Sequence, residues 1–231
     1  MDVNNYINQF LFGYYPYLCL SVFFVGSLIR FDREQYTWKS DSSELLHRGQ
    51  LRWGSNLFHI GVLAIFFGHL VGLLTPLEVW HALGVTPAMK QLTAIIAGAI
   101  AGLTAIVGLA MLTARRLGDA RVLATSKPMD IVIMLLLLAQ LALGLASIPV
   151  SAGHLDGAEM LKLVDWAQRI WTFRSGAAGV IADVSIVFKL HIALGLTIFL
   201  VFPFSRLVHV WSGFASIAYL FRPYQLVRRR A

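Results

Sequence analysis

The sequence predicts an all-α integral membrane protein with five transmembrane helices, and three observations support this class. Hydrophobic residues make up 58% of the 231 residues, and charged residues only 13%. The apolar residues fall in long runs, and a bilayer requires about 20 consecutive apolar residues for each spanning helix. The runs lack the ten-residue alternation of a membrane β-barrel, so helices are the remaining way to satisfy backbone groups in lipid.

The apolar runs define a single membrane-embedded domain that covers 1–231. The first run begins with tyrosines around Pro16, as expected for aromatic residues at a membrane interface. The last run contains Lys189, a charge inside a span. Between the last two runs, 150–182 has apolar residues at helical spacing, which predicts short amphipathic helices on the outer surface. We expect the five helices at about 11–30, 56–75, 91–113, 129–149 and 183–211.

The distribution of Lys and Arg predicts the orientation of these helices. Fourteen basic residues lie on one side and four on the other. The fourteen fall in 30–52, 115–127 and 206–230, and the four are Lys90, Lys162, Arg169 and Arg174. Short cytoplasmic loops carry the excess of positive charge, so the N-terminus is expected on the external, periplasmic side and the C-terminus in the cytoplasm. Because the basic residues lie in loops of a membrane protein, we expect no nucleic-acid partner.

Two further features concern the N-terminal part of the chain. The single cysteine, Cys19, excludes an internal disulfide and a protein-held iron–sulfur cluster, and is interpreted as a small apolar residue of the first helix. The first ten residues lack the basic region of a cleaved signal peptide, so the first helix is expected to serve as its own insertion signal. The following segment, 30–56, mixes charges with Tyr36, Trp38 and Trp53, which suits either a docking surface or an ordinary solvated loop.

The second predicted helix carries two histidines inside an apolar segment, His59 and His69. Ionisable residues within a membrane helix are costly and mark functional sites by default. At a rise of about 1.5 Å per residue, the two stand about 15 Å apart along the helix axis. Gly68 and Gly72 form a small-xxx-small pair beside His69, which lets a helix or a flat ligand approach the backbone.

The fifth predicted helix also carries two histidines, His191 and His209. In an unbroken helix they would lie on one face with a rise of roughly 27 Å between them. Pro203 is expected to disturb the hydrogen-bond ladder between them. Gly195, one turn after His191, is expected to leave room on that face. The rise of about 27 Å does not match the rise of about 15 Å on the second helix, so tilt, the break at Pro203 and side-chain reach must absorb the difference.

Because the two helices are antiparallel, His69 faces His191 near the outer side and His59 faces His209 near the inner side. This arrangement gives two bis-imidazole sites, and two axial imidazoles suit a haem iron that passes electrons and excludes other ligands. No C-x-x-C-H motif is present, so each haem would be held non-covalently, as b-type. Packing histidines or a proton relay are the alternatives. Zinc fits less well, because its ligands converge on one point.

The remaining histidines, His47, His81 and His154, lie in predicted loops or interfaces and are interpreted as surface residues. Arg115 and Arg116 lie at the inner end of the third helix. Arg116 is a candidate contact for an inner-haem propionate. The alternative, which we favour, is that both arginines only contribute to the positive cytoplasmic side.

Six segments carry a more specific signal than the histidine spacing. They are QYTW at 35–38, SNLFHIG at 55–61, GHLVGLLTP at 68–76, DGAEMLKLVDWAQ at 156–168, FPFSRLVHVW at 202–211 and YQLVR at 224–228. Together they resemble the γ subunit, or cytochrome b subunit, of respiratory nitrate reductase, and the resemblance covers nearly the whole chain. It implies a five-helix, quinol-oxidising subunit of the cytoplasmic membrane that carries two b haems and serves anaerobic respiration.

The resemblance also implies roles for individual residues. His69 and His191 match the family's ligands of the outer haem, and His59 and His209 match those of the inner haem. The implied partners are a cytoplasmic iron–sulfur β subunit and a molybdenum α subunit that reduces nitrate, neither of which is part of this chain.

The quinol site is implied by position as well. Lys90, expected just before the third helix, corresponds to a family lysine at that site, and Gly68 lies beside it. We therefore expect quinol oxidation near the outer haem and electron transfer inward. Two alternatives stay open at this point: a di-haem subunit of another quinone-linked complex, such as a hydrogenase or formate dehydrogenase, and a haem-free transporter or assembly protein.

Overall fold

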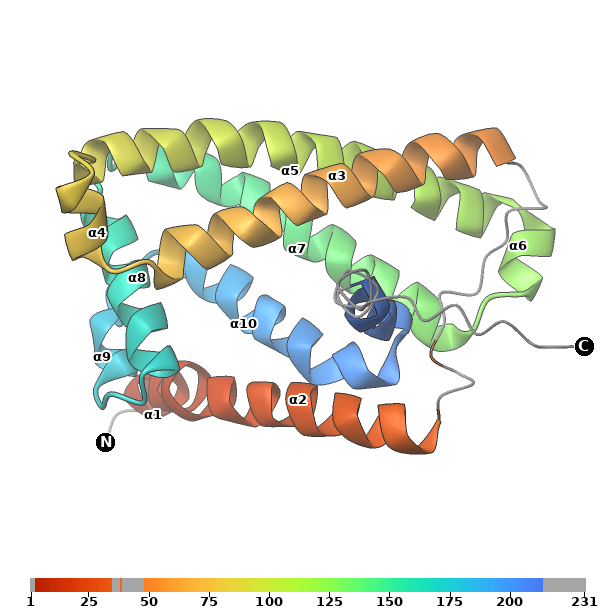
Figure 1. Ribbon diagram of the computed structural model, residues 1–231, viewed down its shortest axis with the longest axis horizontal. Coiled ribbons are helices and arrows are strands. Elements are labelled where there is room, and N and C mark those ends of the chain that lie inside the picture. Colours follow the sequence, from red (N-terminus) through yellow and green to blue (C-terminus); the bar gives the residue numbers. More distant parts are fainter. Residues whose placement is uncertain (1–2, 35–37, 39–47, 214–231) are drawn as a thin grey trace, which may run out of the picture.

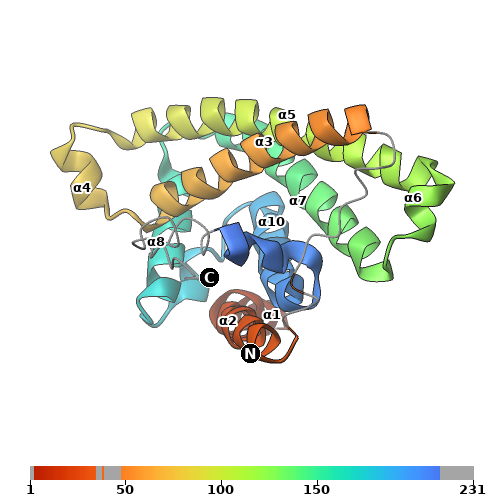
Figure 2. The ribbon, with the colours of Figure 1, turned by 45° about the vertical axis from the view of Figure 1, so that its right-hand side comes forward.

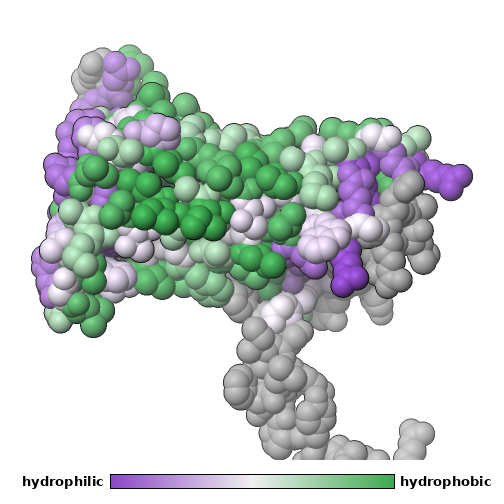
Figure 3. Space-filling model, turned by 90° about the horizontal axis from the view of Figure 1, so that it is seen from above, coloured by the Kyte–Doolittle hydropathy of each residue, from purple (hydrophilic) through white to green (hydrophobic). Residues whose placement is uncertain are grey.

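The computed structural model of the chain describes residues 3–34, 38 and 48–213, and over this part the chain is helical without strands. Five helical segments are long and apolar enough to cross a membrane, which confirms the predicted class. They are Val3–Arg33, Gly49–Leu74, Pro87–Gly118, Pro128–Ala152 and Ile186–Phe204. The segments run lengthwise through the molecule (Figure 1), and an apolar band separates its two polar ends (Figure 3).

Four of the five spans are longer than predicted. The first consists of α1 (Val3–Gln9), a π-helical turn η1 (Phe10–Tyr14) and α2 (Tyr15–Arg33). The next three are α3 (Arg48–Leu74), α5 (Pro87–Gly118) and α7 (Pro128–Ala152). Hydropathy locates only the apolar part of a helix, whereas the helix continues into polar residues until a cap or a breaker ends it.

The start of α5 shows such a cap. Pro87 occupies the first helical turn, and the Oγ1 of Thr86 accepts a hydrogen bond from the backbone N–H of Met89 at 3.2 Å. Proline at the first position and threonine before it both favour a helix start. The expectation that Lys90 precedes the third membrane helix is therefore wrong, because Lys90 lies inside the first turn of α5.

The fifth span is shorter than predicted. Helix α10 (Ile186–Val201) ends two residues before Pro203, so the expected single helix over 183–211 is wrong. Two 3-10 turns follow, η3 (Phe202–Phe204) and η4 (Arg206–Val208), with Ser205 extended between them. Proline has no N–H to continue the ladder. The Lys189 Nζ inside this span donates to the carbonyl oxygen of Ala182 at 2.5 Å, toward the start of the helix, as membrane lysines do.

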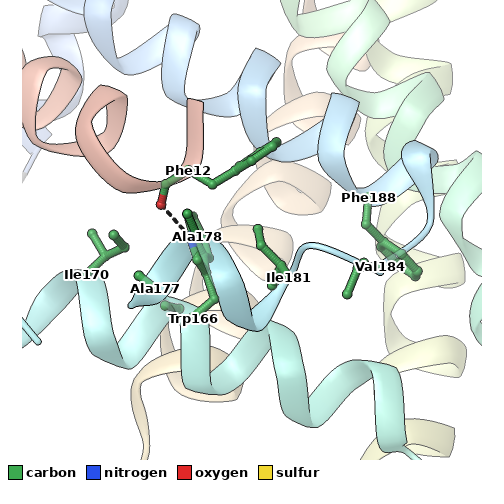
Figure 4. Close-up of a cluster of buried hydrophobic side chains, with 9 residues drawn as sticks. Phe12, Trp166, Ile170, Ala177, Ala178, Ile181, Val184 and Phe188 are labelled. Carbon is green, nitrogen blue, oxygen red and sulfur yellow. Dashed lines mark hydrogen bonds between the residues drawn. The ribbon is translucent and has the colours of Figure 1, made fainter. Parts of the chain in front are cut away.

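Short elements close the two ends of the bundle. Helices α4 (Leu77–Ala82), α8 (Ala158–Trp171) and α9 (Ala177–Val180) lie with α1 at one end, and α6 (Ala120–Ala124) lies at the other (Figure 1). Helix α8 lies within 150–182, where short amphipathic helices are predicted. Its apolar face is buried in the protein, where Trp166 Nε1 donates to the carbonyl oxygen of Phe12 at 2.9 Å (Figure 4).

Close backbone packing joins α3 to α5. A Cβ on Gly61 would lie 2.5 Å from the backbone nitrogen of Ala105, and a Cβ on Gly108 would overlap the backbone of Phe58. On the other side of the molecule, α10 packs against α2 and α7. No interface of comparable size joins α3 to α10, although both border the centre of the bundle (Figure 2). Cys19 is fully buried with a free thiol, as the sequence predicts.

Candidate functional site

The structure brings the four membrane histidines together in two pairs between α3 and the α10 region. His69 of α3 faces His191 of α10, with ring centres 6.1 Å apart and ring planes inclined by 34°. His59 of α3 faces His209, which follows η4, with ring centres 6.2 Å apart and planes inclined by 69°. The two pairs lie about 15 Å apart along α3, from the helical rise.

His59 and His69 are ten residues apart and His191 and His209 eighteen, yet the members of one set face the members of the other across the bundle. The break in the fifth span explains this. From His191 to the end of α10 at Val201 the helix rises about 15 Å, which matches the rise from His59 to His69. The 3-10 turns after Val201 then place His209 opposite His59. The mismatch between the two helices is therefore absorbed by η3 and η4.

Helix α2 holds this break in place. The Arg30 Nη1 donates to the carbonyl oxygens of Pro203 at 2.6 Å and Ser205 at 2.8 Å. Gly26 allows the approach, since a Cβ there would lie 2.9 Å from Pro203 Cγ. Carbonyls released by a proline break require new donors in a membrane, and Arg30 provides them.

Three of the four histidines use Nδ1 in a hydrogen bond to a nearby backbone carbonyl. His69 pairs with Ile65 O at 2.9 Å, His59 with Ser55 O at 2.7 Å and His209 with Arg206 O at 2.6 Å. An Nδ1–H donated to a carbonyl fixes the tautomer that leaves Nε2 for a metal. His191 differs, because its Nδ1 is buried without a hydrogen-bond partner and its Nε2 lies 3.3 Å from Nε2 of Gln140.

The pair distances fit two imidazoles that share one metal ion. With each ligating nitrogen about 2 Å from the ion, the two ring centres stand about 6 Å apart. Within the described residues, no group of three or more His, Cys, Asp or Glu side chains gathers at one point. Two separate pairs suit axial ligation at two places and do not provide the converging ligand set of a structural zinc site.

The face of α3 that carries the histidines is open. His59 and His69 are exposed, and a Cβ on Gly68 or Gly72 would meet nothing within 4 Å. This open backbone leaves space for a flat ligand beside His69. The expectation for Gly195 is wrong, because the Gln140 side chain fills the room beside it: a Cβ there would lie 3.1 Å from Gln140 Nε2.

Lys90 lies at the same end of the bundle as His69, because α4 alone separates the end of α3 from the start of α5. Its side chain is only 8% exposed, and its Nζ is buried without a hydrogen-bond partner. The Nζ lies 5.3 Å from the centre of the Trp80 ring, in cation–π geometry. A buried ammonium with unused donors is costly, so it is suited to receive a polar atom of a ligand.

Comparison with known proteins identifies the family. The model of the nitrate reductase gamma subunit family matches residues 8–230. The chain belongs to this family. It is 53% identical over 226 residues to the respiratory nitrate reductase 2 gamma chain of Escherichia coli strain K12, covering 97% of this chain and 98% of that one. It is 39% identical over 223 residues to the nitrate reductase gamma chain of Bacillus subtilis strain 168, covering 96% and 99%.

This gamma subunit is therefore a multi-pass bacterial membrane protein and a subunit of a nitrate reductase complex, associated with the other subunits of that complex. Membership in the family decides against the alternative of a hydrogenase or formate dehydrogenase subunit. The 48% identity with the respiratory nitrate reductase 1 gamma chain of Escherichia coli strain K12, over 228 residues and 97% and 99% of the two chains, agrees with this assignment.

The arginines at the end of α5 have protein partners. Arg116 Nη1 donates to Ser126 Oγ at 2.7 Å and lies 3.7 Å from Asp130 Oδ2. Arg115 is buried, with 4% of its surface exposed. Arg116 therefore links α5 to the start of α7, which accounts for its position without a propionate.

The other candidate residues of the gamma subunit lie on its surface or outside the described part. His81 and His154 are exposed, as expected, and His47 and Tyr36 lie outside the described residues. Trp53 is 66% exposed on α3, not in a loop, because α3 begins at Arg48. Sequence reasoning assigned no role to Trp80 or Gln140. The signal for Gln140 was its isolation as a polar residue in an apolar helix.

Proposed function

We propose that this gamma subunit oxidises a membrane quinol and passes the electrons through two b haems to an iron–sulfur subunit of the nitrate reductase. His69 and His191 would hold one haem, and His59 and His209 the other. The observation that supports the proposal is the pair of ring-centre distances, 6.1 Å between His69 and His191 and 6.2 Å between His59 and His209. Each distance joins a histidine of α3 to a histidine of α10 or of the segment after η4. A haem held by two imidazoles would supply reversible one-electron chemistry and would be closed to other ligands.

Residues of the protein would orient the histidines of each site. The backbone carbonyls of Ile65, Ser55 and Arg206 hold three imidazoles in the tautomer that presents Nε2. The open surface around Gly68 and Gly72 supports the proposal, because exposed histidines in a membrane helix are costly unless a ligand covers them. Covering this face of α3 would complete the bundle between α3 and α10.

Lys90 would bind the quinol. Its buried Nζ donates to a ring oxygen of the quinol, and Trp80 holds the ammonium from the other side through its ring. Oxidation of a quinol releases two electrons and two protons. The protons would leave at the α4 and α8 end, and His59 and His209 would hold the group that receives the electrons next. Gly68 has no Cβ to narrow the access beside this site.

The Lys and Arg distribution supports an orientation in which the α4 and α8 end would lie outside the membrane and the α6 end in the cytoplasm. In this orientation two electrons move inward while the protons stay outside. Against a membrane potential of about 100 mV this transfer stores about 4.6 kcal/mol. The partners at the cytoplasmic end would be the iron–sulfur β subunit and, through it, the molybdenum α subunit.

A spectrum of the purified complex tests the proposal. Addition of a reduced quinol should give the reduced absorption of a b-type cytochrome, and nitrate should then reverse it. A complex that reduces nitrate from an artificial donor but shows no b-type absorption in this subunit would overturn the proposal and favour a haem-free role.

A further inference from the structure

The segment that joins α3 to α5 carries Trp80 and forms one rigid unit. At the end of α4, the backbone N–H of Val85 donates to the carbonyl oxygen of Trp80 at 2.9 Å, and that of Gly84 donates to His81 at 2.9 Å. Gly84 has a φ of 73°, so the helix ends in a Schellman motif. These bonds leave little freedom inside the segment. The place of Trp80 therefore depends on how the two ends of the segment are held.

Helix α8 holds the first end. The Nε2 of Gln168 donates to the carbonyl oxygens of Leu73 at 3.3 Å and Thr75 at 3.2 Å. A carboxamide nitrogen has two hydrogens, one for each acceptor. The last carbonyls of a helix have no partners within it and need donors from elsewhere. Gln168 therefore fixes the end of α3 directly before Pro76, the residue that precedes α4.

The same helix contacts the second end. Gly157 precedes the first turn of α8 with a φ of 80°. A Cβ there would lie 3.0 Å from the carbonyl oxygen of Pro87 and 3.2 Å from its Cβ. Pro87 is the first residue of α5 and lies in the same turn as Lys90. The backbone at the start of α8 is thus in close contact with the backbone at the start of α5.

Helix α8 is itself fixed within the protein. Trp166 and Ile170 are buried in the cluster drawn in Figure 4, where Trp166 Nε1 donates to the carbonyl oxygen of Phe12 at 2.9 Å. From Gly157 to Gln168 the helix rises about 16 Å, so its two contacts are well separated. A segment that is rigid inside and held at both ends by one fixed helix keeps Trp80 in one place.

We propose that Gln168 and Gly157 are positioning residues for the quinol site, because they hold Trp80 against Lys90. This role rests on the proposed function, in which Lys90 binds the quinol. The Nζ of Lys90 lies 5.3 Å from the centre of the Trp80 ring and has no hydrogen-bond partner. A displaced α4 would remove the cation–π contact that keeps the ammonium in its place. Quinol affinity then depends on two residues of a different helix.

The test is the KM of the assembled complex for a water-soluble quinol, with nitrate as the acceptor. Gln168→Leu removes both hydrogen bonds and should raise the KM by about tenfold, as expected for the loss of two hydrogen bonds. The rate at saturating quinol and the b-type absorption after dithionite should match the wild type. Asn8→Leu is the matched control, because Asn8 Nδ2 donates to the carbonyl oxygen of Ala178 at 2.8 Å at the same end of the molecule. An unchanged KM in Q168L, or an equal rise in N8L, would overturn the inference.

A double-mutant cycle separates positioning from a general loss of stability. Trp80→Leu should raise the KM by itself. Gln168→Leu should then add little to it, because the side chain that Gln168 positions is already absent. A full further rise in the double variant would show that Gln168 acts independently of Trp80 and would contradict the inference, as would a normal KM in W80L.

Gly157→Ala covers the case in which a change at Gln168 prevents assembly. The added methyl group meets the Pro87 carbonyl oxygen at a φ that favours glycine, so the second end of the segment should shift and the KM should rise as in Q168L. A normal KM in assembled G157A would overturn the inference. If quinol reduces no b-type signal in the wild-type complex, the proposed function fails instead, so the two failures are distinguishable.

Discussion

The guanidinium Nη1 of Arg30 in α2 donates a hydrogen bond to the carbonyl oxygen of Pro203 at 2.6 Å, where the fifth span stops being an α-helix. The same nitrogen also donates to the carbonyl oxygen of Ser205 at 2.8 Å. The turn that follows carries His209 to its place opposite His59. A contact between the first and last spans therefore lies at the break that precedes His209.

Replacement of Arg30 should affect the inner site selectively. Arg30→Gln removes the charged hydrogen bonds to the two carbonyls, at a cost of about 2 kcal/mol. We expect a lower melting temperature and a shifted or lost inner b-type component, with the outer component retained. Arg33→Gln is the matched control, because Arg33 is an exposed arginine at the end of the same helix. Equal effects of the two substitutions would contradict the role of Arg30.

The packing of α3 on α5 gives a second prediction. Gly108→Ala forces a methyl group into the backbone of α3 and should destabilise the protein by about 1–3 kcal/mol. Gly98→Ala on the same helix meets nothing within 4 Å and should be neutral or stabilising by up to about 1 kcal/mol. Thermal unfolding in detergent measures both. A neutral G108A would show that α3 and α5 are not in close contact.

The arrangement of helices was largely predictable from the sequence, because a bilayer demands uninterrupted apolar runs and the chain has five. Helix ends were less predictable, since hydropathy does not detect the polar helical turns at the ends of a span. The start of α5 carried a readable signal in Thr86 and Pro87. The path of the chain after Val201 carried no such signal, because Pro203 predicts a helix break but not the direction of the segment that follows.

The pairing of the four histidines was predictable from the sequence, but the contacts that other residues make with them and with the break at Pro203 were not. The antiparallel order of the second and fifth predicted helices indicated which histidines oppose each other. The contacts of Arg30 with the carbonyls near Pro203 and of Gln140 with His191 join residues far apart in the chain, so no local pattern contains them. Gly195 showed the limit of such patterns: its missing side chain makes room for a glutamine, not for a macrocycle.

Lys90 provides a prediction about the quinol. Lys90→Met should slow reduction of the b-type signal by quinol by about tenfold or more, since a hydrogen bond to a charged group contributes about 1.5–3 kcal/mol. Chemical reduction with dithionite should be unaffected. Lys162→Met, a half-exposed lysine paired with Asp183 at 2.6 Å, is the control and should leave the quinol rate unchanged. A normal rate in K90M would remove Lys90 from the quinol site.

The Lys162–Asp183 pair gives a prediction for pH. The hydrogen bond from Lys162 lowers the pKa of the Asp183 carboxyl below its usual value. A depressed folded-state pKa stabilises the protein above the unfolded-state pKa of about 4, and this contribution is lost as the pH falls through the folded value. Asp183→Asn should therefore lower the melting temperature slightly at pH 7 and have no effect near pH 2. An equal loss at both pH values would exclude the ionised pair as its source.

The haem content and the reduced-minus-oxidised spectrum of single histidine variants of the assembled complex test whether the two histidine pairs hold two haems. Wild-type protein should hold two b haems in this subunit. His69→Leu and His191→Leu should lose the same component together with quinol oxidation, and His59→Leu and His209→Leu should lose the other. His81→Leu, an exposed histidine, should keep both. Loss of different components within one pair, or full haem content after any of the four substitutions, would show that these pairs do not hold two haems.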